Sequence, residues 1–142
     1  MTPSDTKKEV ESVERGSNAS KSDEANLWFN RAKELQTVTG WFTNPQLASE
    51  YLARSYQLAP NGAVATLHSV ALVQLNQFDK AIVEIGKAIR GETNTKSRGF
   101  LLNYRGEIYR KMGDTTRACE DFRIAKALSN DDAIRTYATL CR

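Results

Sequence analysis

The sequence has 142 residues, a length that fits one domain rather than two. Hydrophobic residues make up 40% and charged residues 26%, as in ordinary globular proteins, and a net charge of +3 is too small to indicate nucleic acid. No apolar run approaches the roughly 20 residues of a membrane-spanning helix, which excludes an integral membrane protein. One histidine (His68) and two cysteines (Cys119 and Cys141) are too few for the usual His/Cys zinc site, and we expect no metal and no cofactor.

The first 22 residues differ in composition from the rest of the chain. Their only hydrophobic side chains are those of Met1, Val10, Val13 and Ala19, and they include no aromatic residue. Such a segment cannot bury enough apolar surface to offset the entropy cost of ordering it. We therefore predict a disordered tail over residues 1–22 and a helical domain over residues 23–142.

From residue 23 onward, small and hydrophobic residues recur at helical spacing, most clearly near the C-terminus. Gly106 and Tyr109 belong to one helix, which Gly113 is placed to end. Ala118 and Phe122 then share a face of a second helix, which folds back against the first. Because Gly106 has no side chain, the pattern predicts that the two helices approach closely at this residue.

The same frame fits twice more, earlier in the chain. The matching residues are Trp28, Arg31, Ala32, Leu35, Ala48, Leu52 and Pro60 in the first copy, and Ala65, His68, Ser69, Leu72, Ala81, Ile85 and Ala88 in the second. This pattern resembles the tetratricopeptide repeat, a helical hairpin of about 34 residues. The resemblance covers about residues 23–130, with longer loops than the family pattern and no proline at the end of the second copy. It implies an all-α solenoid of three antiparallel helix pairs plus a C-terminal capping helix.

Capping residues and periodicity together place the individual helices. The predicted ranges are 23–38, 45–58, 61–75, 78–90, 96–112, 115–128 and 131–140. Asn44, Asn61 and Asp114 are the expected N-caps, since their side-chain oxygens can accept hydrogen bonds from the first turn. Gly91 and Gly113 are expected to close the helices that precede them.

The resemblance also implies a binding surface, because the first helices of successive repeats line a concave groove. The residues that fall on groove positions are Phe29, Lys33, Gln36, Val70, Val73, Gln74, Phe100, Asn103, Glu107 and Arg110. Apolar residues flanked by polar and basic ones suit an extended peptide or a short helix of a partner protein. The alternative is that these side chains are only solvated surface. The lysine, asparagine and arginine clamp by which some members of the family grip acidic chaperone tails is absent, which disfavours a chaperone-tail adaptor.

Three further residues have two interpretations each. His68 lies on the apolar side of its helix with no ligand at metal spacing, so a structural histidine is favoured over a catalytic base. Trp41 and Phe42 fall in the loop over residues 39–44, which lengthens the first repeat. They form either a partner-binding knob or a loop folded back onto its own helices, and the second is favoured.

Charge is uneven along the chain. Residues 87–126 carry ten basic and five acidic side chains, an excess that could attract an acidic partner. Nucleic-acid grooves interleave such charges with stacking aromatic residues, which this region does not, so nucleic acid is disfavoured as a partner. No phosphate-binding loop, nucleophile motif or metal motif is present, and we expect no enzymatic activity.

The two cysteines bear on the compartment. Cys119 and Cys141 each lie about eleven residues from the turn near Ser129 and Asn130, so an antiparallel hairpin brings them side by side, within disulfide range. If they are bridged, the protein works in an oxidising compartment such as the periplasm. The tail would then be the spacer of an exported lipoprotein. The alternative to a bridge is that Cys119 is a small core residue and Cys141 an incidental one near a frayed helix end. If the chain is complete as it stands, we expect it to be cytoplasmic with two free thiols.

These observations together predict a non-enzymatic adaptor or scaffold that binds a peptide or helix of another protein, with an acidic partner favoured by the basic excess. One alternative is a lipoprotein-type assembly factor for pili or secretion, tethered to a membrane through its N-terminal tail. The other is a regulatory domain that self-associates into a homo-oligomer through its repeats.

Overall fold

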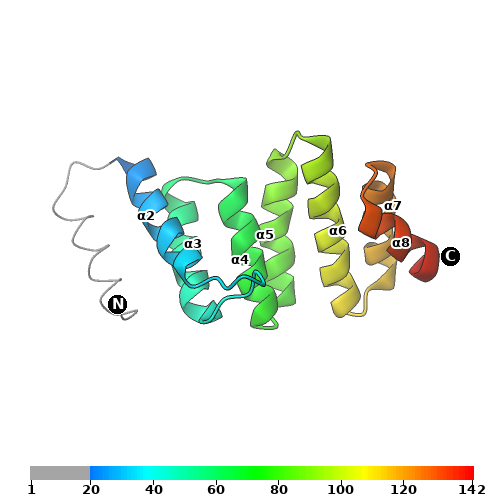
Figure 1. Cartoon of the computed structure of the whole chain (residues 1–142), viewed down its shortest axis with the longest axis horizontal. Helices are drawn as coiled ribbons and strands as arrows, with labels where there is room; N and C mark the ends of the chain where they lie inside the picture. The colour runs from blue at the N-terminus through cyan, green and yellow to red at the C-terminus, as the bar shows by residue number, and fades with distance from the viewer. Residues whose placement is uncertain (1–19) are drawn as a thin grey trace. The chain divides into compact units, whose positions relative to one another are not determined.

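The structure is a computed structural model that describes residues 20–142, and these form seven α-helices with no β-strand (Figure 1). The predicted all-α class is therefore confirmed, and within each of the two units described below consecutive helices pack against each other. The tail predicted over residues 1–22 lies outside the described residues as far as residue 19. Lys21 and Ser22, which the prediction assigned to the tail, already belong to the first helix.

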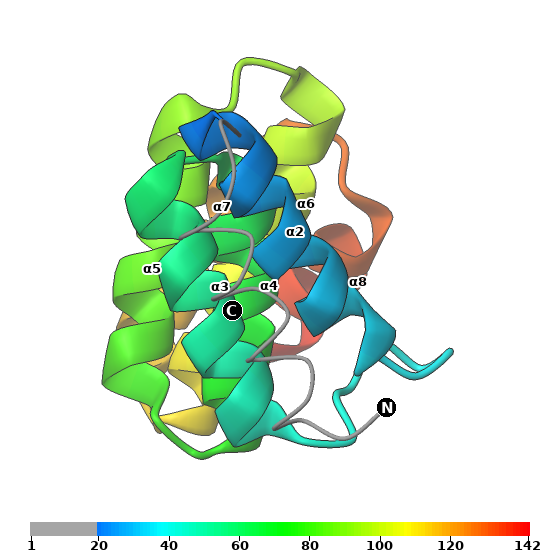
Figure 2. The same ribbon diagram turned by 90° about the vertical axis from the view of Figure 1, so that its left-hand side faces the viewer.

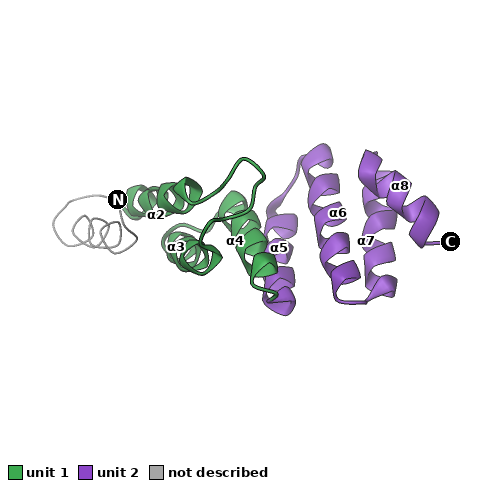
Figure 3. Ribbon diagram, turned by 60° about the horizontal axis from the view of Figure 1, so that its bottom comes forward, with its two compact units in different colours: residues 1–76 green, residues 77–142 purple. Residues whose placement is uncertain are grey.

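The chain divides into two compact units, the first ending at Asn76 and the second beginning at Gln77 (Figure 3). Unit 1 contains the helices α2 (Lys21–Glu34), α3 (Pro45–Leu58) and α4 (Gly62–Gln74). Unit 2 contains α5 (Phe78–Gly91), α6 (Thr95–Lys111), α7 (Thr115–Ala127) and α8 (Asp131–Leu140). Each observed range agrees with its predicted range to within one residue except at the two ends of α2.

The core of unit 1 forms where α2 and α3 pack together. The Trp28 ring of α2 lies 5.4 Å from the Tyr51 ring of α3, centroid to centroid, and both side chains are buried. Small residues let the helices approach, and the buried Ser55 hydroxyl donates a hydrogen bond of 2.8 Å to the Ala25 carbonyl of the facing helix. A buried hydroxyl without such a partner would cost free energy, so this bond favours one register of the pair.

Helix α2 differs from its predicted range of 23–38. It begins earlier because the Ser20 hydroxyl caps it, accepting from the Asp23 amide. It ends at Glu34 because the next residues turn into a narrow loop, in which the Leu35 carbonyl accepts from the Thr43 amide at 2.8 Å. Long-range pairing thus competes with local helix propensity after Glu34, and the pairing prevails.

Unit 2 is held together chiefly by the α6–α7 contact. Phe122 of α7 is fully buried and packs directly over Gly106 of α6, whose missing side chain makes room for the ring. The predicted close approach at Gly106 is confirmed. Leu102 and Ile108 of α6 are buried beside it. The sequence pattern that identified the third repeat therefore marks the best-packed hairpin of this unit.

The predicted helix caps are confirmed. The side chains of Asn44, Asn61 and Asp114 accept hydrogen bonds from first-turn amides of α3, α4 and α7. Gly113 has a φ of +80°, a left-handed conformation that favours glycine, and it ends α6 as expected. Helix α5 ends at Gly91.

Candidate functional site

The α2 residues predicted to line a partner groove are only partly available. The Phe29 ring is half-buried against the core of unit 1, and the Lys33 ammonium lies 5.5 Å from the centre of that ring. Gln36 is engaged within the loop that follows α2, where its side-chain amide donates a hydrogen bond of 2.8 Å to the Gly40 carbonyl. Of the three, Lys33 alone is exposed.

The α4 residues of the predicted groove are largely structural. Val73 is expected at a partner-facing surface, but its side chain is only 6% exposed. Val70 is half-buried against the core. The Gln74 side chain accepts from the Phe42 amide at 2.8 Å and donates to the Phe42 carbonyl at 2.7 Å, which fastens the loop to α4. Helical spacing alone could not reveal that bond, since the partner lies 32 residues away.

The α6 residues of the predicted groove form a continuous stripe within unit 2. Phe100, Asn103, Glu107 and Arg110 follow one another at intervals of three or four residues, which places them along one side of the helix. The Phe100 ring is 58% exposed, and Arg110 is exposed at the other end of the stripe. Its guanidinium lies 3.8 Å from the Glu107 carboxylate, a loose surface pair. We call these four residues the α6 stripe.

Asn103 in the middle of the α6 stripe has unused hydrogen-bonding capacity. Its side-chain oxygen is buried and accepts no hydrogen bond from any described residue. Buried polar atoms are almost always paired in folded proteins, so an unpaired one calls for an explanation. A ligand amide that reached this side chain would supply the missing donor.

An ion pair fixes the side of α6 that faces α7. The Arg105 guanidinium donates two hydrogen bonds of 2.8 Å, one to each carboxylate oxygen of the buried Asp121. These bonds raise the pKa of the Arg105 guanidinium above its ordinary value, so the residue stays cationic throughout the neutral range. Arg105 is one of the ten basic side chains of residues 87–126, but its charge is paired with Asp121 and adds nothing to a basic surface.

His68 fits the structural interpretation. Its ring is half-buried on α4, and its Nε2 atom lies 2.8 Å from the Ser49 hydroxyl of α3. In residues 20–142 no group of three or more histidine, cysteine, aspartate or glutamate side chains is placed to hold a metal ion.

The two aromatic residues of the loop between α2 and α3 have different surroundings. Phe42 is buried in the core of unit 1, as expected for a loop folded back on its own helices. Trp41 points away from the core and is 45% exposed. Successive residues of an extended segment face opposite ways, which is why Phe42 is buried while its neighbour Trp41 is exposed.

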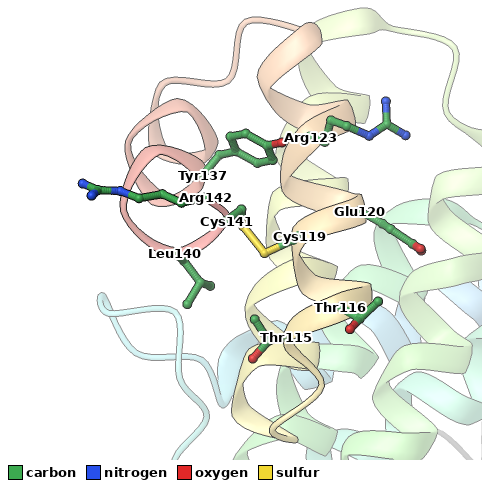
Figure 4. A pocket seen from close by; sticks show the side chains of 9 residues that line it. All are labelled: Thr115, Thr116, Cys119, Glu120, Arg123, Tyr137, Leu140, Cys141 and Arg142. Atoms are coloured by element: carbon green, nitrogen blue, oxygen red, sulfur yellow. A yellow bond between two sulfur atoms is a disulfide. The ribbon is translucent and has the colours of Figure 1, made fainter.

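The cysteines lie side by side, as their symmetric spacing about the turn predicts. The sulfur atoms of Cys119 and Cys141 are 2.06 Å apart and the Cα atoms 5.6 Å apart, the geometry of a disulfide (Figure 4). The turn that lies midway between the two cysteines in the sequence contains Ser129, which has a φ of 64°. Ala133 is the only buried residue of α8, so this helix has little apolar surface of its own to hold it.

A shallow pocket of ≈ 390 Å³ lies beside the cysteine pair in unit 2. Its lining comes from the start of α7 and the end of α8, and Figure 4 shows its nine labelled side chains around the two sulfur atoms. The lining contains two basic side chains, those of Arg123 and Arg142, and one acidic side chain, that of Glu120. Nearby, the Lys126 ammonium lies 4.8 Å from the centre of the Tyr137 ring, a contact that helps α8 stay against α7.

Comparison with protein-family models and with curated proteins finds no match to this chain. No helix in the described part of the chain, residues 20–142, is both long and apolar enough to cross a membrane.

Proposed function

We propose that this chain is a tetratricopeptide-type module without catalytic activity, and that its α6 stripe binds an extended peptide or short helix of another protein. The observation that carries the proposal is the exposure of the Phe100 side chain. A large aromatic ring that is 58% exposed on a long, regular helix is unfavourable in water and marks a surface that gains from being covered.

The dimensions and charges of the α6 stripe suggest what it binds. At a rise of about 1.5 Å per residue, Phe100 and Arg110 lie about 15 Å apart along the helix. An extended peptide covers that distance with four to five residues, at about 3.3 Å each. The partner segment would place an apolar side chain against Phe100 and an acidic one against Arg110, with a backbone amide available to Asn103 between them.

The experiment begins by purifying the tagged full chain with its partner and mapping the bound segment of that partner. The purified segment is then titrated calorimetrically against wild type and against the double variant Phe100→Ala, Arg110→Ala. Val83→Ala is the matched control, because Val83 of α5 is as exposed as Phe100 (57%) and lies in the same unit. Val73→Ala is unsuitable as a surface probe, because it would empty part of the core of unit 1.

We expect the double variant to raise Kd by about 10- to 100-fold, since buried aromatic and arginine side chains dominate interface energies. The control should stay within about twofold of wild type. An unchanged Kd for a double variant that melts like wild type would contradict the proposal.

A second proposal concerns the compartment. We infer that the chain works in an oxidising, exported environment, and the support is the cysteine pair at disulfide distance across α7 and α8. This favours the lipoprotein-type assembly factor for pili or secretion as the alternative function. Thiol titration of the denatured, unreduced protein from its native source tests the point: we expect no free thiol, and two free thiols would exclude the bridge.

A further inference from the structure

The loop between α2 and α3, residues 35–44, has a regular, hydrogen-bonded backbone. Figure 2 shows it as a narrow cyan excursion beyond the end of α2. Gln36 and Phe42 form an antiparallel bridge, and the Thr37 amide donates to the Trp41 carbonyl at 2.7 Å. The Gly40 amide closes the tip by donating to the Thr37 carbonyl at 3.0 Å.

Two contacts fasten this loop to the rest of unit 1. The Phe42 side chain is buried in the core, and the Gln74 side chain pairs with both backbone groups of the same residue. An amide that accepts and donates in this way replaces a neighbouring strand for Phe42. The loop is thus ordered on folding, and a ligand that binds its tip does not have to bear that entropy cost.

The tip of the loop displays apolar side chains to solvent. Val38 is 105% exposed, the full exposure of a valine with no neighbour, and Trp41 is 45% exposed. The Trp41 indole N–H donates no hydrogen bond to any described residue. We call these two side chains the Val38–Trp41 knob. Single exposed apolar residues are common on protein surfaces, but here an aliphatic and an aromatic side chain share one rigid tip.

The chain segment that carries the knob is uncharged. Residues 35–49 contain no lysine, arginine, aspartate or glutamate, so the nearest charges along the chain are Glu34 and Glu50. A surface made for a phosphate or for anionic lipid would carry cations, each of which adds about 1 kcal/mol of attraction to an anionic membrane. The knob has none, and two side chains alone bury too little apolar area for stable binding to lipid.

We propose that the Val38–Trp41 knob docks into an uncharged apolar pocket on another protein, where a carbonyl or hydroxyl oxygen accepts the indole N–H. Tryptophan is the side chain most suited to such an anchor, because it offers a large apolar face and one donor. The inference goes beyond the proposed function, because it assigns a binding role to unit 1 that does not depend on the α6 stripe.

The test places a photo-crosslinking amino acid at position 38 of the full chain in its native host, with position 83 as the control for an equally accessible valine. The protein crosslinked at position 38 is identified by mass spectrometry, purified and titrated against wild type, Val38→Lys and Val83→Lys. Because Val38 touches nothing in its own unit, Val38→Lys is not expected to change the melting temperature. In parallel, wild type and Val38→Lys are sedimented with vesicles of phosphatidylcholine and phosphatidylglycerol.

We expect a crosslinked protein at position 38 that is absent at position 83. We also expect Val38→Lys to raise the Kd for that protein at least about tenfold, while Val83→Lys stays within about twofold. Wild type should not sediment with the vesicles. The inference is overturned by the lack of a crosslink at position 38, by an unchanged Kd for Val38→Lys, or by sedimentation of wild type with vesicles. None of these results bears on peptide binding by the α6 stripe, so the two proposals are tested independently.

Discussion

Replacing Gly106 with alanine tests the packing of the α6–α7 hairpin most directly. A Cβ atom at Gly106 would lie 2.6 Å from Cε1 of Phe122 and 2.9 Å from its Cδ1. Carbon atoms pack at about 3.5–4.0 Å, so the ring would have to move by about 1 Å. Phe122 is fully buried and has no route to solvent, and we therefore expect the hairpin to be strained. Gly106→Leu adds three more carbons and is expected to be worse.

The magnitude follows from two opposing effects. Overpacking of a well-packed site costs about 1–3 kcal/mol. Alanine is favoured over glycine in a helix interior by about 1 kcal/mol, which offsets part of that cost. Gly86→Ala serves as the matched control, because Gly86 also lies inside a helix of unit 2, and its Cβ would meet only the Arg90 side chain at 3.5 Å. The difference between the two variants removes the propensity gain and isolates the packing cost.

The free energy of unfolding is measured by urea titration followed by circular dichroism. Tryptophan fluorescence is unsuitable, because Trp28 and Trp41 both lie in unit 1 and report on that unit. We expect Gly106→Ala to be less stable than Gly86→Ala by about 1–3 kcal/mol. Combining Gly106→Ala with Phe122→Leu should recover part of the loss. If Gly106→Ala proves as stable as Gly86→Ala, the proposed contact does not constrain the hairpin and the reasoning is refuted.

Three further predictions concern unit 2. Replacing Cys119 and Cys141 together by serine opens a loop of 22 residues, which we expect to cost about 3 kcal/mol. Hydrogen exchange should then show faster exchange in α8 than in α6, and unchanged α8 protection would contradict this. Arg105→Met leaves the buried Asp121 carboxylate unpaired and should cost about 3 kcal/mol in urea titrations, most of it recovered when Asp121→Leu is added; a loss below about 1 kcal/mol would show that the pair is solvated. The hydrogen bond from the Arg117 amide lowers the pKa of Asp114 below 3.8, so its contribution to stability is complete above that pH and disappears as the pH falls through the lower, folded-state pKa. Asp114→Ala should therefore have a lower urea midpoint than wild type at about pH 6, and the gap should close toward about pH 2.

Much of the local structure of this protein is determined by the sequence alone. The caps at Asn44, Asn61 and Asp114 were predictable because a capping hydrogen bond joins residues two or three positions apart. Gly106 was predictable because its helical repeat with Ala118 and Phe122 needs only spacing within one hairpin. The pairing of the two cysteines followed likewise from their equal distance to one turn.

The tertiary structure decided what individual side chains are free to do. Gln74 and Val73 lie at positions that helical spacing assigns to a binding surface, but the first holds the backbone of Phe42 and the second is buried. The sequence suggests that Arg105 is a surface charge, but its guanidinium is bonded to Asp121 on the other helix of the hairpin. Exposure depends on residues far apart in the chain, and no spacing rule contains that information.

The loop after α2 shows both levels at once. Its inserted length and its aromatic residues were visible in the sequence, but the order of the loop rests on Phe42 reaching the core and on a bond from Gln74, 32 residues away. That distant anchoring also ends α2 four residues early and leaves Val38 in solvent. The sequence alone therefore determined where the helices lie and how they are capped, because those signals act over a few residues. Only the tertiary structure decided which side chains remain available to a partner, because burial is settled by the whole unit.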